Sequence, residues 1–212
     1  MSKKKLAIWS VLAMLVLVFV TACGGKEKVD LGKVENGTYK NEYFGISFQV
    51  PQGWNVQDEE TMRQVNEVGK EIAAGNDKTK QKQFDLAEQK LLNLAMASKF
   101  PMGEAVLNPS VISNAEKVSK SQVKTSKDYL EATKKIIIAS QIPYQFKEIT
   151  SVKVGGKDFD VLETSLSQDG GNLTQKIYST LMNGYALNLI ITYVDDESKA
   201  ETDKLIESVS FK

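Results

Sequence analysis

The chain has 212 residues with 27 basic and 27 acidic side chains, no histidine and one cysteine. Without histidine it lacks the commonest general base and metal ligand, and one cysteine allows neither an intrachain disulfide nor a thiolate zinc site. Arg63 is the single arginine, which argues against recognition of nucleic acid, and we expect no metal and no cofactor.

Residues 1–22 have the pattern of a secretory signal peptide. Lys3–Lys5 form a basic start, and Leu6–Val20 follow as 15 residues without a charge. A basic start, an apolar run and small residues after it are typical of such signals. The run is short for a transmembrane helix, which needs about 20 apolar residues.

The four residues Val20, Thr21, Ala22 and Cys23 resemble the lipobox of bacterial lipoproteins. In that family a diacylglyceryl group is attached to the cysteine sulfur, and a peptidase cuts just before it. The resemblance implies that acylated Cys23 holds the chain in the lipid bilayer of the cell membrane, on its extracytoplasmic face. Two acyl chains are enough for stable anchoring. The alternative is a signal anchor without a lipid and with an incidental thiol.

This interpretation divides the chain into three segments. Residues 1–22 are the predicted signal peptide, residues 23–37 a polar, glycine-rich tether, and residues 38–212 a single domain. Removal of residues 1–22 takes away three lysines and no acid, so the remaining chain carries a net charge of −3. The many lysines, the single arginine and Gly24-Gly25 favour a Gram-positive envelope.

The first half of the domain contains both strand and helix patterns. Alternation of Ile46 and Phe48 with polar neighbours predicts a strand, and Met62 and Val65 at helical spacing predict a helix after it. In chain order we expect a strand at 46–50, helices at 58–75 and 76–90, and strands at 91–100 and 111–118.

The second half begins with a helix and continues as a meander of strands. Leu130 and Ile137 share one face of the predicted helix, and Pro143 ends it. Asn183-Gly184 between two apolar runs is a strong signal for a type I′ hairpin. We expect a helix at 126–141, strands at 145–154, 157–167, 173–182 and 185–194, a helix from 195 with a capping box of Ser198 and Glu201, and a final strand at 209–211.

Both ends of the domain resemble the PsbP-like family, which includes the Mog-type Ran-binding proteins and many small bacterial lipoproteins. The resemblance rests on YFGISFQVPQGW at 43–54, and on GYALNLIITY at 184–193 followed by a helix and SVSF at 208–211. It implies an α+β fold in which an antiparallel β-sheet, a meander, is sandwiched between α-helices, an α/β/α arrangement. Helices on both faces of one sheet agree with the predicted elements. The resemblance implies no catalytic residue, because members of the family bind unrelated partners.

Four groups of residues are candidates for a site, and for each we favour a structural role. We expect the lysines at 78–82 with Lys90 to form a solvated helix face. Asp195–Glu197 are expected to cap a helix rather than to bind calcium, and Asp158 with Asp160 to lie at an exposed strand edge rather than to form an acid–base pair. An aromatic cluster is expected to be core packing; it consists of Tyr39, Tyr43, Phe44 and Trp54.

The sequence therefore favours a non-enzymatic, membrane-tethered module that binds a protein or a polymer of the cell envelope. A solute-binding lipoprotein for a transporter is the first alternative. Such proteins usually have two lobes around a cleft, and a single meander-rich domain is too small for that architecture. A hydrolase of envelope polymers that uses Asp or Glu side chains is the second. Cys23 is the one site residue that the sequence assigns.

Overall fold

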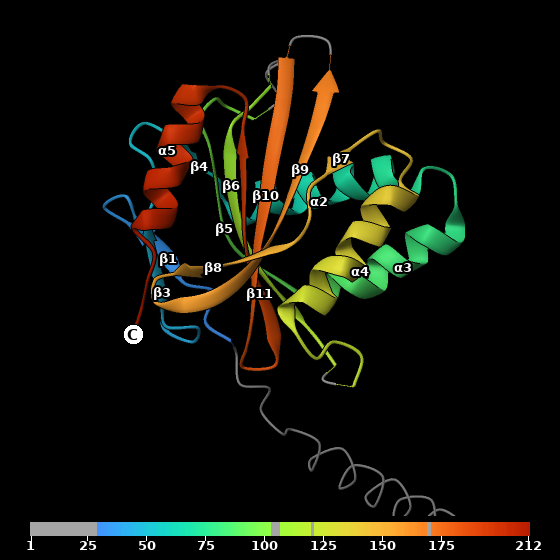
Figure 1. Cartoon of the computed structure of the whole chain (residues 1–212), viewed down its shortest axis with the longest axis horizontal. Coiled ribbons are helices and arrows are strands. Elements are labelled where there is room, and N and C mark those ends of the chain that lie inside the picture. Colours follow the sequence, from blue (N-terminus) through green and yellow to red (C-terminus); the bar gives the residue numbers. More distant parts are fainter. Residues whose placement is uncertain (1–28, 103–106, 120, 169–170) are drawn as a thin grey trace, which may run out of the picture. The chain divides into compact units, whose positions relative to one another are not determined.

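The computed structural model describes residues 29–102, 107–119, 121–168 and 171–212 (Figure 1). The contacts divide the chain into Met1–Asp30 and Leu31–Lys212, and every helix and strand given below belongs to the second unit. The predicted signal peptide and Cys23 lie outside the described residues. Within the described part of the chain, no helix has the length and apolar character needed to cross a membrane.

The main sheet has eight antiparallel strands, and its centre is the predicted meander. The spatial order is β4-β5-β6-β11-β10-β9-β7, with β8 also paired to β9. The strands are β4 (Asn55–Val56), β5 (Leu91–Ser98), β6 (Ser110–Lys117), β7 (Gln145–Phe146), β8 (Thr150–Val154), β9 (Lys157–Gln168), β10 (Gly171–Met182) and β11 (Tyr185–Tyr193). The strand predicted at 145–154 is thus two short strands, both paired to β9.

The turn between β10 and β11 has the predicted conformation. Asn183 and Gly184 have φ angles of 53° and 81°, and Met182 pairs with Tyr185 directly across the turn. Both turn residues need a positive φ in a type I′ hairpin, which asparagine and glycine tolerate best. This turn fixes the register of β10 and β11 in the centre of the sheet.

A second sheet of four short strands was not expected from the sequence. Its strands are β1 (Lys33–Glu35), β2 (Thr38–Asn41), β3 (Ile46–Gln49) and β12 (Ser210–Phe211), in the order β1-β2-β3-β12. The fold thus begins before residue 38, inside the predicted tether. Fully buried Tyr39 explains this extension, because its hydroxyl group donates a 2.7 Å hydrogen bond to the carbonyl oxygen of Leu31.

Helices lie on both sides of the main sheet (Figure 1). Helix α4 packs on β9 and β10 and α2 on β5, whereas α5 packs on β11 and on β3 of the second sheet. The helices are α2 (Glu59–Ala74), α3 (Lys78–Glu88), α4 (Ser126–Ala139) and α5 (Asp196–Glu207). The predicted α+β fold, an antiparallel sheet between helices, is confirmed.

Leu130 of α4 is the centre of the core on the helix α4 side of the sheet. It is 0% exposed and packs against buried Leu162 of β9 and Ile177 of β10. Because successive side chains of a strand point to opposite faces, the neighbouring Val161 and Tyr178 lie on the side of α5. The two faces therefore carry different sets of side chains, and each face has its own cleft.

The cap of α5 corrects one prediction. The capping box joins Asp195 and Ser198, rather than Ser198 and Glu201. The Asp195 carboxylate accepts a hydrogen bond from the backbone N–H of Ser198 at 2.7 Å, and the Asp195 N–H donates to Ser198 Oγ at 3.2 Å. Aspartate is as good an N-cap as serine, so the helix begins three residues earlier than the predicted box required.

Candidate functional site

The predicted aromatic cluster is core packing at three of its four positions. Tyr39, Phe44 and Trp54 are buried, as expected, and Tyr39 stacks on Phe48 with ring centroids 4.9 Å apart. Tyr43 is half-buried and lies against Phe44 at 4.9 Å. Tyr43 and Phe44 also pack on Tyr185 of β11, so the cluster joins the second sheet to the main sheet.

The charged candidates also have structural roles. Lys78, Lys82 and Lys90 are exposed on or beside α3, as expected for a solvated helix face. Asp195 caps α5, which agrees with the preference for capping over calcium. No group of three or more His, Cys, Asp or Glu side chains within the described residues is arranged to hold a metal ion.

Asp158 and Asp160 do not share one role, which corrects their assignment to a common exposed edge. Asp158 is exposed and forms a 2.8 Å ion pair with Lys153. Asp160 is half-buried and accepts hydrogen bonds of 2.6 Å from Ser126 and from Ser151. Since Ser126 begins α4, the Asp160 carboxylate ties that helix to the sheet.

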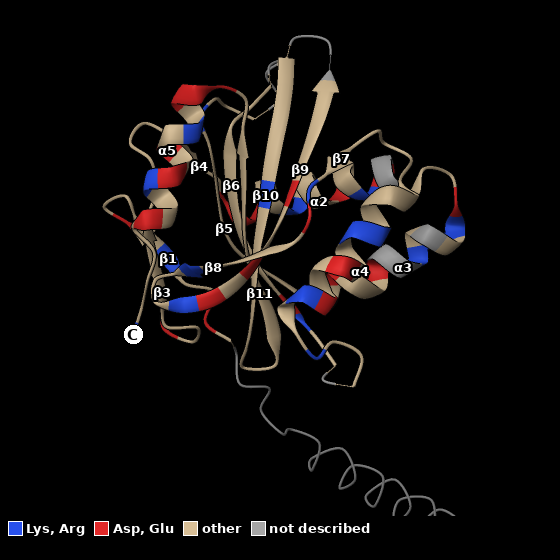
Figure 2. Cartoon of the chain, in the orientation of Figure 1, with Lys and Arg blue, Asp and Glu red and all other residues tan. Residues whose placement is uncertain are grey.

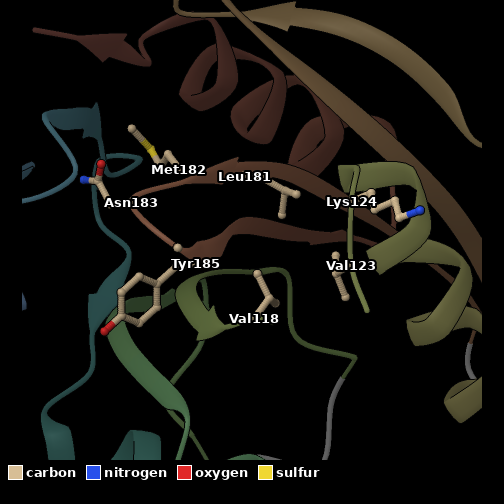
Figure 3. A pocket seen from close by; sticks show the side chains of 8 residues that line it. Val118, Val123, Lys124, Leu181, Met182, Asn183 and Tyr185 are labelled. Atoms are coloured by element: carbon tan, nitrogen blue, oxygen red, sulfur yellow. The ribbon is translucent and has the colours of Figure 1, made fainter. Parts of the chain in front are cut away.

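A hollow of about 640 Å³ lies beside the turn between β10 and β11, and we name it the hairpin hollow. Figure 3 shows Val118 and Val123 on one side of it and Leu181 of the hairpin on the other. Its polar residue Asn183 donates a 2.9 Å hydrogen bond to the carbonyl oxygen of Tyr43. This amide therefore secures the turn, and the hollow offers mainly an apolar surface.

A better organised cleft lies on the helix α4 side of the main sheet, where α2 and α3 meet β5 and β6. We name it the helix-side cleft; its volume is about 370 Å³. Most of its surface is apolar, with Val65 and Leu91 in its wall and the Glu116 carboxylate among its few polar groups. A mostly apolar cleft with a small number of fixed polar groups is the usual form of a binding site.

Gly69 keeps the helix-side cleft open. It lies inside α2 and lines the cleft, and a Cβ added at this position would meet no atom within 4 Å. Its backbone does not have a positive φ angle, so neither packing nor conformation requires glycine here. Glycine inside a helix costs about 1 kcal/mol relative to alanine. The exposed backbone at Gly69 therefore allows a bound molecule to approach α2 closely.

A chain of buried hydrogen bonds positions Glu116 in the cleft wall. The Tyr129 hydroxyl group donates to Oε2 of Glu116 at 2.9 Å and accepts from Nδ2 of Asn188 at 3.2 Å. Nδ2 of Asn188 also donates to Oδ1 of Asn114 at 2.9 Å, and Asn188 is 2% exposed. The Glu116 carboxylate is thus the outer end of a hydrogen-bond network that begins at Asn188 in the centre of the sheet.

Burial, and secondarily the charge of Glu116, raise the pKa of Tyr129 well above its ordinary value of 10.0. The phenol therefore keeps its proton throughout the neutral range and acts as a fixed hydrogen-bond donor. Such a group orients the Glu116 carboxylate and cannot serve as a general base at neutral pH.

Acidic side chains outnumber basic ones around the helix-side cleft. Nζ of Lys70 lies 2.8 Å from Asp85 and 3.1 Å from Glu67, and these hydrogen bonds raise the pKa of Lys70. Glu88 and Glu116 line the same cleft, and the described residues provide neither with an ion pair. Among the described residues, Lys70 and at longer range Arg63 therefore face these four carboxylates, and charges of both signs are spread over the helices as a whole (Figure 2).

Sequence reasoning missed the residues of this network. Asn93, Asn114 and Asn188 are neighbours across β5, β6 and β11, and Asn66 of α2 donates to Asn93 at 3.1 Å. Asn93 and Asn188 interrupt apolar runs, LLNLAMA and YALNLIITY, whereas Asn114 follows Ser113 in VISNAEKV. A side-chain amide in a buried strand needs a hydrogen-bond partner. An asparagine within an apolar strand was therefore the signal in the sequence that could have indicated a buried polar network.

Comparisons with known proteins give structural neighbours alone. No protein-family model and no curated protein sequence matches the chain. The solution structure of cyanobacterial PsbP (CyanoP) from Synechocystis is similar with a TM-score of 0.47 and 16% identity, over 91% of this chain and 99% of that one. The crystal structure of LpqN, involved in cell envelope biogenesis of Mycobacterium tuberculosis, gives 0.40 and 14%, over 79% and 83%.

A crystal structure from Bacteroides thetaiotaomicron is similar over 79% of this chain with a TM-score of 0.43 and 14% identity. The chain spans about 45% of the length of that protein. At such identities the similarities concern the fold alone and assign no ligand or partner. One of them is a PsbP, from the family that the two ends of the sequence resemble.

Proposed function

We propose that the chain is a non-enzymatic binding module of the cell envelope, held at the membrane through acylated Cys23. Its helix-side cleft would bind a basic amphipathic segment of a partner protein. The observation that carries this proposal is the Glu116 carboxylate, which Tyr129 fixes at 2.9 Å in the wall of a mostly apolar cleft. The lipobox resemblance at residues 20–23 supports the anchor.

The charges and the apolar surface of the cleft specify the occupant. Lysine or arginine side chains of a partner would meet Glu88 and Glu116 in the lining of the cleft; among the described residues Arg63 acts on Glu88 at longer range. The apolar face of the same segment would cover Val65 and Leu91. Recognition of an amphipathic helix in an apolar groove with charged ends is a common mode of peptide binding.

A peptide with leucines on one helical face and lysines on the other tests the proposal. Its binding to the full-length chain in detergent micelles can be followed by fluorescence anisotropy. We expect Glu116→Gln to weaken binding about tenfold, because a hydrogen-bonded charge pair is lost. We also expect the affinity to fall as salt is added.

The matched controls are a second peptide and a second variant. The peptide with glutamates in place of the lysines should not bind. Glu207→Gln, an exposed residue at the end of α5 on the other side of the sheet, should leave binding unchanged. Equal binding of the two peptides, or equal effects of the two variants, would contradict the proposed site.

A further inference from the structure

The opposite face of the main sheet has a second cleft, on the side of α5. We name it the strand-side cleft; its volume is about 360 Å³, and its floor is formed by β9 and β10. Val152 of β8 and Val161 of β9 give it an apolar wall. It is separate from the helix-side cleft, because its floor residues alternate with Leu162 and Ile177, which face α4. It therefore plays no part in the proposed partner contact.

Two hydrogen-bond donors without acceptors meet on its floor. Lys176 and Tyr178 lie two apart on β10 and so point to the same face. The Lys176 side chain is 19% exposed and Tyr178 is 7% exposed, and both line the cleft. Neither the ammonium group nor the hydroxyl group has a hydrogen-bond acceptor among the described residues. Both groups border the cleft, so a bound molecule with an acceptor group would find two donors on this floor.

Lys176 forms a long ion pair with Glu163 and a cation–π contact with Tyr193. Its Nζ is 3.9 Å from Oε2 of Glu163 and 5.7 Å from the centre of the Tyr193 ring, both outside hydrogen-bond distance. Glu163 has a closer cation, because Nζ of Lys147 lies 2.6 Å from its Oε1. Lys147 makes the shorter contact with Glu163, so a ligand carboxylate could compete with Glu163 for Lys176.

The Tyr178 hydroxyl group remains a donor over the whole neutral range. Burial first, and then the charge of Asp203, raise the pKa of Tyr178 to about 12. An ammonium group and a protonated phenol side by side suit an oxyanion, which accepts hydrogen bonds from both.

A carboxylate fits this cleft better than a phosphate. Two lysines and two glutamates line it, Lys147 and Lys176 against Glu148 and Glu163. A doubly charged phosphate would meet two carboxylates, whereas a ligand with one carboxylate and one ammonium group matches the balanced charges. Glu148 is exposed at the cleft and has no side-chain partner among the described residues, so it is placed to accept the ammonium group.

We propose that the strand-side cleft binds an amino acid or a short peptide through its terminal carboxylate, held by Lys176 and Tyr178, with the ligand's ammonium group at Glu148. The valines beside the floor suit a ligand with a small apolar side chain. A volume of about 360 Å³ is at the lower end of small-molecule sites, which span roughly 300–1,000 Å³.

Calorimetric titration of the full-length chain in detergent micelles with alanyl-alanine tests this assignment. Alanine is titrated in parallel to distinguish a free amino acid from a peptide terminus, and either is an accepted ligand. We expect the C-terminal amide of alanyl-alanine to bind about tenfold more weakly or not at all, because it carries no charge for Lys176. N-acetylation should weaken binding less, since Glu148 is exposed.

Variants locate the site. Lys176→Met and Tyr178→Phe keep the length and the ring of the native side chains, and each should lower the affinity about tenfold. Lys153→Met, at an exposed ion pair with Asp158 near the turn between β8 and β9 and outside the cleft lining, should leave it unchanged. Thermal melting of Tyr178→Phe checks that the variant is folded.

Three results would overturn the assignment. The first is that neither alanine nor alanyl-alanine gives a heat of binding. The second is that the chain binds alanyl-alanine and its C-terminal amide with equal affinity. The third is that Lys176→Met binds alanyl-alanine as tightly as the wild-type chain. Binding of inorganic phosphate in place of the dipeptide would also reject a carboxylate site. The proposal stands apart from the partner contact, because Glu116→Gln on the other face should not alter the titration.

Discussion

The hydroxyl group of Tyr129 donates a 2.9 Å hydrogen bond to Oε2 of Glu116, which joins helix α4 to the wall of the helix-side cleft. The same hydroxyl group accepts from Asn188, 2% exposed in the middle of β11. The orientation of one carboxylate at the surface thus depends on polar groups inside the sheet. This link between core and cleft determines what several variants should do.

Removal of this hydroxyl group should affect both stability and binding. In Tyr129→Phe the Asn188 amide and the Glu116 carboxylate each lose a partner, so we expect the free energy of unfolding to fall by about 1–3 kcal/mol. Binding of the basic peptide should weaken as well, because Glu116 is no longer fixed. Urea denaturation and anisotropy measure the two effects. Tyr144→Phe, which changes a half-buried tyrosine before β7, is the control. An equal loss of peptide binding in Tyr144→Phe would contradict the role of Tyr129 in positioning Glu116.

Substitution of Gly69 should change stability and binding in opposite directions. Gly69→Ala should stabilise the chain by about 0.5–1 kcal/mol, because alanine favours the helix and its methyl group meets open space. The methyl group narrows the cleft, so the peptide should bind more weakly. Thermal denaturation and anisotropy give the two values. Val68→Ala, at the exposed neighbouring position of the helix, should leave peptide binding unchanged, and tighter peptide binding to Gly69→Ala would contradict the role of Gly69.

The cap of α5 should make stability depend on acidic pH. Hydrogen bonds from the Ser198 side chain and backbone lower the pKa of the Asp195 carboxyl group from its ordinary value of 3.8. Because the folded chain binds this proton less tightly than the unfolded chain, the stabilisation is complete above about pH 4 and is lost as the pH falls through the lowered folded-state pKa. Asp195→Asn keeps a capping side chain and should remove this part of the acid dependence. Denaturation curves of the wild-type chain and of Asp195→Asn at several pH values test this prediction. An identical dependence of stability on pH in the two proteins would contradict it.

The predicted anchor has a direct test in cells. Cys23→Ala removes the thiol that carries the lipid, so the variant should leave the membrane fraction or stay uncleaved at residue 22. Membrane fractionation and the mass of the product distinguish these forms from the acylated chain. The wild-type product should carry a diacylglyceryl group on Cys23, and a variant that is still cleaved and membrane-bound would remove the lipoprotein interpretation.

The strands and helices were predictable where local chemistry specifies them. Asn183-Gly184 predicts a hairpin because both residues tolerate a positive φ, and Thr125 with Asp128 caps α4 at the start of its predicted range. The second sheet was missed because β12 pairs with β3 from the other end of the chain. A pairing of two residues so far apart leaves no periodic signal in either segment.

Neither cleft was predictable from the sequence, for the same reason. The helix-side cleft needs Glu116 of β6 beside Tyr129 of α4, and the strand-side cleft needs Lys147 close to Glu163. These neighbours are set by the strand order and by the register, which the sequence pattern does not specify between distant segments. Conversely, the aromatic cluster and Asp195 were assigned correctly as packing and capping, because those roles depend on nearby residues.

Photo-crosslinking in intact cells tests the central claim, that a partner binds in the helix-side cleft. A photoreactive residue replaces Ala87, which lines the cleft, or Ala200, which is exposed on α5 on the other side of the sheet. The account predicts one dominant adduct from position 87, joined to a basic and apolar segment of the partner, absent from position 200 and reduced in Glu116→Gln. The same adducts from both positions, or no adduct from position 87, would contradict it.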